Sequence, residues 1–165
     1  MDTFVESGMT FGPFDDTKIF HIEKSKMLKN CEGIKTVEFI YHKRKYVLQF
    51  VEAKSSSPVK RPGNEQEYNT YLDEIVQKFE DSFQLYMAGI LKRKSGYDQI
   101  SKELFDADYQ KMNFVFVLVI NGHEKEWLPP LVLDIEHKMR RFQTIWNCSV
   151  VVLNDELAKE QHLIL

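Results

Sequence analysis

A carboxylate and an ammonium group stand two residues apart in the stretch YVLQFVEAKSSSP, which runs from Tyr46 to Pro58. Its first half is apolar and aromatic, which predicts a strand that enters a core, and the serine run and the proline end that strand. Because side chains on a strand alternate between faces, Glu52 and Lys54 point to the same side. Two interpretations stay open: an ion pair at the end of a sheet, or a catalytic or metal-binding site.

A second carboxylate, Glu38, precedes Glu52 by 14 residues and lies in the apolar run IKTVEFIY. The linker HKRK between the two runs is short enough for a hairpin. With an odd-numbered loop, Lys43 to Lys45, the numbers of facing residues sum to 88, and Glu38 is a diagonal neighbour of Glu52 on one face. With an even-numbered loop, Glu38 lies on the other face. The hypothesis of a shared site therefore depends on the hairpin register.

Two converging carboxylates, with a backbone carbonyl such as that of Ala53 and with water, form a hard oxygen site suited to Mg²⁺ or Mn²⁺. Such an ion binds a phosphate oxygen and lowers the pKa of a water that it holds. Lys54 would position that water or offset charge that develops on phosphorus. Phosphodiester hydrolysis needs these parts, so Glu38 and Glu52 are candidate metal ligands, and Glu38, Glu52 and Lys54 are candidate catalytic residues.

The segments TVEFIY and FVEAKSS, with a loop and a helix behind them, resemble the motif of the PD-(D/E)xK, or restriction-endonuclease-like, nuclease superfamily. The resemblance puts Glu38 at the first metal-binding acid, which is usually Asp in the family, Glu52 at the second acid and Lys54 at the lysine. It implies a Mg²⁺- or Mn²⁺-dependent endonuclease or exonuclease that acts on DNA more readily than on RNA. The superfamily also has members that keep the fold without cleavage, which leaves the alternative of an inactive binding or assembly module in a bacterial defence or DNA-handling complex.

Some members of that superfamily add an acid from the first helix, or a Gln or Tyr from the helix that follows the motif. Glu23 is the nearby candidate for the added acid. Gln66, Tyr68 and Tyr71 lie in the corresponding region of the later helix, and the sequence does not decide among them.

Two further residue types could bind ligands. The five histidines, at positions 21, 42, 123, 137 and 162, show no zinc-binding spacing and are interpreted as surface or capping residues. Trp127, close to Pro129 and Pro130, is interpreted either as packing at the start of a helix or as an exposed binding patch.

The elements that must position these residues predict one α/β domain of 165 residues, with residues 1–17 as a loosely ordered N-terminal extension. A short strand is expected at 18–22, then the hairpin, then a long helix capped by Asn64 with an apolar stripe from Tyr68 to Ile90. A central strand at 113–120, a helix from the two prolines to about Trp146, a buried strand at 148–154 and a short last helix follow. This order predicts a mixed sheet flanked by helices, with a restriction-endonuclease-like core.

Charge and composition narrow the class of partner. The segment from Lys18 to Arg61 holds 11 Lys and Arg against four acids, a local +7, so the rest of the chain carries −10 of the total of −3. Such a segment either attracts phosphate backbones or is a solvated face. The longest apolar run has seven residues, which excludes a membrane helix, and the N-terminus lacks the pattern of a secretion signal. We therefore expect a cytoplasmic protein with reduced cysteines. The family resemblance implies a nucleic-acid partner, and a homodimer or a larger complex.

Overall fold

The computed structural model describes residues 1–165. Its centre is a sheet of five strands, namely β3 (Ile19–Phe20), β4 (Phe39–Arg44), β5 (Val47–Lys54), β6 (Asn113–Ile120) and β7 (Ser149–Asn154). The strands lie side by side in chain order, β3-β4-β5-β6-β7. β4 is antiparallel to both of its neighbours, whereas β5, β6 and β7 are parallel. The sheet is therefore mixed, as the sequence predicts.

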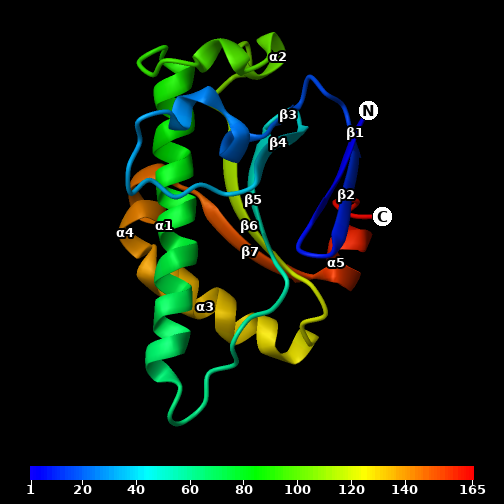
Figure 1. Cartoon of the computed structure of the whole chain (residues 1–165), viewed down its shortest axis with the longest axis vertical. Helices are drawn as coiled ribbons and strands as arrows, with labels where there is room; N and C mark the ends of the chain where they lie inside the picture. The colour runs from blue at the N-terminus through cyan, green and yellow to red at the C-terminus, as the bar shows by residue number, and fades with distance from the viewer.

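Helices and a hairpin cover the two faces of this sheet (Figure 1). One face packs against the long α1 (Glu65–Ile90), α3 (Leu128–Lys138) and α4 (Arg140–Trp146). The other face packs against the hairpin of β1 (Asp2–Glu6) and β2 (Met9–Phe14) and against α5 (Asp155–Glu160). The remaining short helices are η1 (Ile22–Lys24), η2 (Lys26–Leu28), η3 (Tyr97–Gln99), α2 (Lys102–Phe105) and η4 (Lys125–Trp127). The α/β class is confirmed.

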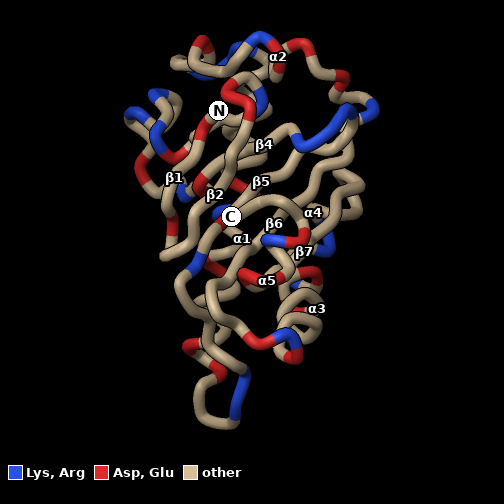
Figure 2. The backbone as a smooth tube through the Cα atoms, turned by 90° about the vertical axis from the view of Figure 1, so that its right-hand side faces the viewer, with Lys and Arg blue, Asp and Glu red and all other residues tan.

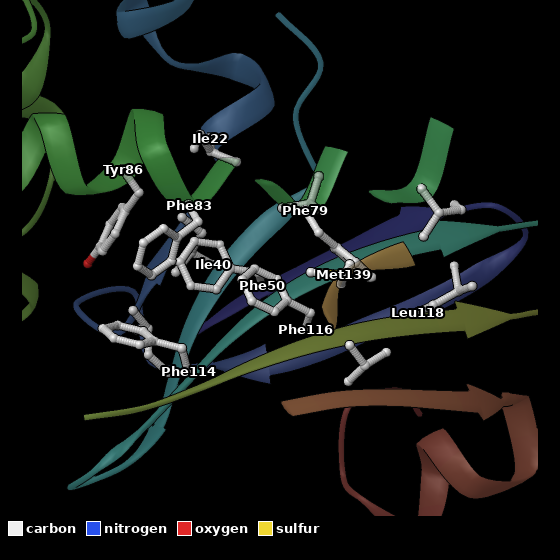
Figure 3. Packing of buried hydrophobic residues seen from close by; sticks show 14 of the residues in the cluster. Ile22, Ile40, Phe50, Phe79, Phe83, Tyr86, Phe114, Phe116, Leu118 and Met139 are labelled. Carbon is white, nitrogen blue, oxygen red and sulfur yellow. The ribbon is translucent and has the colours of Figure 1, made fainter. Parts of the chain in front are cut away.

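The larger core lies between the sheet and α1 and contains 27 buried residues. Figure 3 shows aromatic rings of α1 and of the two central strands meeting there. The ring centroids of Phe50 and Phe116 are 5.1 Å apart, and those of Phe79 and Phe116 are 5.2 Å apart. The apolar stripe predicted for α1 is confirmed, because its members from Tyr68 to Tyr86 are buried.

The N-terminal residues differ from the expectation of a loosely ordered extension. Residues 2–14 form the hairpin of β1 and β2, and Phe11 and Phe14 are buried in a second core of 13 residues. Phe39 on β4 lies in the same core, 5.4 Å from Phe11 and 5.5 Å from Phe14 between ring centroids. The aromatic residues of this segment therefore cover the face of the sheet that α1 leaves open.

The ends of the long helices and the position of the last strand also differ from what the sequence predicts. Asn64 precedes α1, but its side-chain oxygen accepts from the Arg61 amide and not from an amide of the helix. The single helix expected up to Trp146 is divided at Met139 into α3 and α4. The last strand, β7, is an edge strand with β6 as its one neighbour, so it is less enclosed than the sequence predicts.

The basic segment does not form one continuous charged face. Figure 2 shows Lys and Arg positions and Asp and Glu positions both spread over the molecule. Lys18, Lys24, Lys54 and Lys60 each lie within 4.0 Å of a carboxylate oxygen, so part of the local charge is neutralised within the protein. None of the helices combines the length and the apolar character needed to cross a membrane.

Candidate functional site

The hairpin register brings Glu38 and Glu52 to the same face of the sheet. Phe39 faces Val51 and Ile40 faces Phe50, so facing numbers sum to 90 and not to 88. The turn between Arg44 and Val47 has two residues, the even-numbered case, but an irregularity between His42 and Arg44 shifts the register by one and restores the shared face. The Glu38 amide donates to the Val51 carbonyl at 3.1 Å. Continued by one step, the ladder puts Glu38 opposite Glu52, and not diagonal to it as expected.

Glu52 is fully buried and only one of its oxygens is paired. Lys78 on α1 donates to Oε1 at 2.7 Å, and Lys54 Nζ lies 3.5 Å from the same oxygen. Oε2 is buried without a hydrogen-bond partner. Burial raises the pKa of Glu52, and the two lysines oppose that rise. An unpaired carboxylate oxygen in the interior is costly, which makes this oxygen a strong acceptor for a cation.

Lys54 is shared between two carboxylates. Its Nζ donates to Glu74 on α1 at 3.1 Å, besides lying close to Glu52. This hydrogen bond is the main reason that the pKa of Glu74 is lowered. The Lys54 side chain is 23% exposed, so the ammonium group stands between the buried Glu52 and solvent. The sequence-based pairing of Glu52 with Lys54 is therefore present, but as one part of a larger cluster.

Lys78 was not among the residues identified from the sequence. Burial lowers its pKa, but the ion pair with Glu52 outweighs burial, and the net shift is upward. Lys78 lies three residues after Ile75 and next to Phe79, both in the apolar stripe of α1. A lysine at the border of a buried stripe is the signal that could have indicated a partner for a buried acid.

Two further carboxylates meet Glu38 at the start of β4. Glu6 at the end of β1, Glu23 in η1 and Glu38 each offer an oxygen, and these oxygens lie within 4.8 Å of one another. Burial, a hydrogen bond with Glu23 and the charge of Glu52 raise the pKa of Glu38 to about 8. Burial is the largest of these causes and the neighbouring carboxylates add to it, so the surroundings of Glu38 favour its protonated form. Glu6 was missed from the sequence, since nothing in residues 1–17 showed that β1 ends beside the hairpin.

The structure shows which of the other candidate residues predicted from the sequence lie near Glu38 and Glu52. Glu23 joins the acidic cluster. The Tyr71 hydroxyl is buried, and burial raises its pKa to about 12, with the charges of Glu52 and Glu74 adding to the rise. Tyr68 instead donates to Asp134 at 2.8 Å, and Gln66 is exposed in the first turn of α1. Tyr71 thus belongs to the site region, whereas Gln66 does not.

The donor set fits a hard divalent cation. Oxygens of Glu6, Glu23 and Glu38 lie close enough to one another to hold one ion, whereas Glu52 is on the facing strand and is not part of that close set. The unpaired Oε2 of Glu52, and the charges of Glu52, Glu23 and Glu6 that add to the raised pKa of Glu38, indicate an excess of negative charge in this region. The five best-defined hollows of the protein surface are lined by other residues, so none of them opens onto this cluster.

Comparisons of the chain with known proteins found no match. No family model matches the chain, and neither a curated protein nor a solved structure matches it.

Proposed function

We propose that this protein is a metal-dependent nuclease-like enzyme that hydrolyses phosphodiester bonds, with DNA preferred over RNA. The observation that carries the proposal is the Glu38–Glu52 pair on facing strands, with an unpaired Glu52 oxygen and two lysines beside it. The element order supports it as well, since the hairpin is followed by a helix and two parallel strands, the order that the PD-(D/E)xK resemblance implies.

The proposed roles follow from charge and position. Glu38 and Glu52 would hold Mg²⁺ or Mn²⁺, with Glu23 and Glu6 as further oxygen donors. The ion would act as a Lewis acid on a phosphate oxygen and lower the pKa of a water bound to it. Lys54, at the exposed side of Glu52, would offset charge on the phosphate, and Lys78 would fix the Glu52 carboxylate in place. Glu38 gives up its proton when the ion binds, so affinity for the ion should rise with pH up to about 8.

A second candidate function rests on the short Lys78–Glu52 contact of 2.7 Å. If Glu52 serves only to pair with Lys78 and binds no metal, the protein is an inactive module with a nuclease-like fold that holds a partner. It would then bind nucleic acid or a protein in a cytoplasmic defence or DNA-handling complex without cutting it.

Mn²⁺ titration and cleavage assays distinguish the two functions. Single- and double-stranded DNA and RNA serve as substrates for wild type, Glu38→Gln, Glu52→Gln and Lys54→Met. We expect Mn²⁺-dependent cleavage that both Glu variants reduce by roughly 100-fold or more, with weakened Mn²⁺ binding. Lys54→Met should lose cleavage while it keeps Mn²⁺ affinity.

Glu160→Gln is the matched control, because Glu160 is exposed at the end of α5, on the other side of the sheet. It should retain wild-type Mn²⁺ affinity and cleavage. If all variants bind Mn²⁺ equally weakly and none cuts any substrate, the enzyme proposal is wrong and the inactive module remains.

A further inference from the structure

A partly enclosed hollow of about 230 Å³ lies at the end of the molecule where β5 leads into α1. Figure 1 shows the loop after β5 and the segment before α3 at this same end. Lys60 comes from the loop, Tyr68 from the first turns of α1, and His123 and Trp127 from the segment between β6 and α3. The volume is below the roughly 300–1,000 Å³ of pockets for whole small molecules, so the hollow suits one flat ring.

The ring of His123 is a polar group of this hollow whose nitrogens make no hydrogen bond within the protein. It is 8% exposed, and its ring makes no hydrogen bond within the protein, although its backbone carbonyl accepts from Asn154. It is thus buried, unlike the surface or capping residue that the sequence indicates. Burial lowers its pKa, so the ring is neutral at pH 7 and offers one N–H donor and one nitrogen acceptor.

The charges of Lys60 and Asp134 at the hollow offset each other. The Tyr68 hydroxyl donates to Asp134 at 2.8 Å, and Lys60 Nζ lies 3.9 Å from the same carboxylate oxygen. Lys60 Nζ also lies 5.9 Å from the centroid of the Tyr68 ring, the position that a cationic ligand would take. The hollow therefore favours a neutral ring with hydrogen-bonding edges over a cation or an anion.

Trp127 supplies a surface for stacking. Its side chain is 36% exposed, and its ring meets the His123 ring edge-on, with centroids 5.4 Å apart. An exposed indole beside a buried imidazole combines a flat apolar surface with a polar group in one small volume. Nucleobases are neutral, flat and edged with donors and acceptors, and they stack on aromatic side chains when they are not paired.

We propose that this hollow binds one unstacked base of a single-stranded nucleic acid, with the base on Trp127 and its edge hydrogen-bonded to His123. The proposal rests on the proposed function, because the nucleic-acid strand whose base is bound here would be the strand that continues to the Glu38–Glu52 site. Tyr68 and Glu74 are six residues apart on α1, roughly 9 Å along its axis, and Glu74 binds Lys54. This spacing puts the hollow and Lys54 along the same helix, so the bound base would belong to the strand that reaches the site.

Abasic scanning tests the proposal in a Glu52→Gln background without metal, so that no cleavage occurs. The probe is a short fluorescein-labelled single-stranded oligodeoxynucleotide in which one base at a time is removed, and binding is followed by fluorescence anisotropy. We expect removal of the base at one position to weaken binding by about 5- to 150-fold. Trp127→Ala should weaken binding of the intact probe by a similar factor and show no further loss at that abasic position.

The chain's other tryptophan provides the matched control. Trp146 is 43% exposed at the end of α4, and Trp146→Ala should retain the abasic effect. Trp127→Phe, which keeps a flat ring, should retain most of the affinity and guards against a folding defect in Trp127→Ala. His123→Ala should lose the preference for one base at the sensitive position.

The outcomes separate this proposal from the proposed function. If one position is sensitive and depends on Trp127 but wild type cuts nothing with Mn²⁺, the base site stands and the nuclease proposal fails. If wild type cuts but all abasic probes bind alike, or Trp127→Ala binds as tightly as its parent, the base site is wrong. Failure of the protein to bind any single-stranded probe, or binding of an aromatic peptide in its place, also overturns the base site.

Discussion

Phe50 and Glu52 are neighbours on one face of β5, and both are 0% exposed, yet their surroundings differ in kind. Phe50 packs against several rings, with centroids 5.1 Å away for Phe116 and 5.8 Å away for Phe83. Glu52 depends on one close contact, Lys78 at 2.7 Å, and leaves its second oxygen unpaired. One strand thus passes from an apolar core into a charged cluster within two residues.

The apolar and the charged halves of this face contribute to the protein in different ways. The apolar half of the face is stabilised by many interchangeable contacts, none of which needs a specific partner. The charged half contributes little net stability, since desolvation of a buried pair can offset its attraction. Burial of Glu52 is therefore weak evidence for a stabilising role, and mutations on the two halves should have different consequences.

The largest effect is expected in the apolar half. Phe50→Ala removes a ring from the centre of the larger core and should lower the free energy of unfolding by about 4 kcal/mol, from lost burial and the cavity left behind. Phe50→Leu keeps most of the volume and should cost about 1 kcal/mol. Urea unfolding followed by circular dichroism measures both. Equal losses for the two variants would contradict the cavity explanation.

A smaller effect is expected when the charged half loses Lys78. Lys78→Met leaves the buried Glu52 charge with Lys54 alone, and should lower the free energy of unfolding by about 2–3 kcal/mol, less than the roughly 3–5 kcal/mol of a pair left with no partner. The double variant Glu52→Gln/Lys78→Met removes both charges and should recover most of that loss. The same urea experiment tests it, and additive losses in the double variant would show that the two residues do not interact.

Much of the fold follows from the sequence because its signals are local. The continuous apolar run at 113–120 indicates a covered strand, and the periodicity of the stripe from Tyr68 to Tyr86 indicates a helix. The shared face of Glu38 and Glu52 was harder to predict, because it depends on a two-residue turn and a bulge. No residue type in the sequence indicates either of them. The sequence named both carboxylates but had the wrong register.

What the sequence could not indicate depends on contacts between distant segments. Lys78 reaches Glu52 across 26 positions, and Glu6 reaches Glu38 only because the N-terminal hairpin folds onto the sheet. Residues 1–17 contain Phe11 and Phe14, but spacing alone does not show that a short aromatic segment covers a sheet face. The cluster of four carboxylates is therefore a product of tertiary structure, whereas the Glu-x-Lys motif is readable from the chain.

The smallest effect, and the one most specific to the charged half, is the pH dependence produced by Glu38. Its pKa rises from 4.5 to about 8 in the folded protein, so between these values the folded state holds a proton that the unfolded state has lost. Stability should therefore fall as pH rises from about 4.5 to 8. A shift of this size corresponds to about 5 kcal/mol at most, and because Glu38 is half-buried and screened by solvent we expect about 1–2 kcal/mol.

Glu38→Gln mimics the protonated side chain, so it should remove this slope and be the more stable protein at pH 8. Urea unfolding at intervals across this range, with Glu160→Gln as the matched control that keeps the slope, measures it. Added Mn²⁺ should abolish the slope in wild type if the ion displaces the Glu38 proton, and an unchanged slope would separate the proton on Glu38 from metal binding.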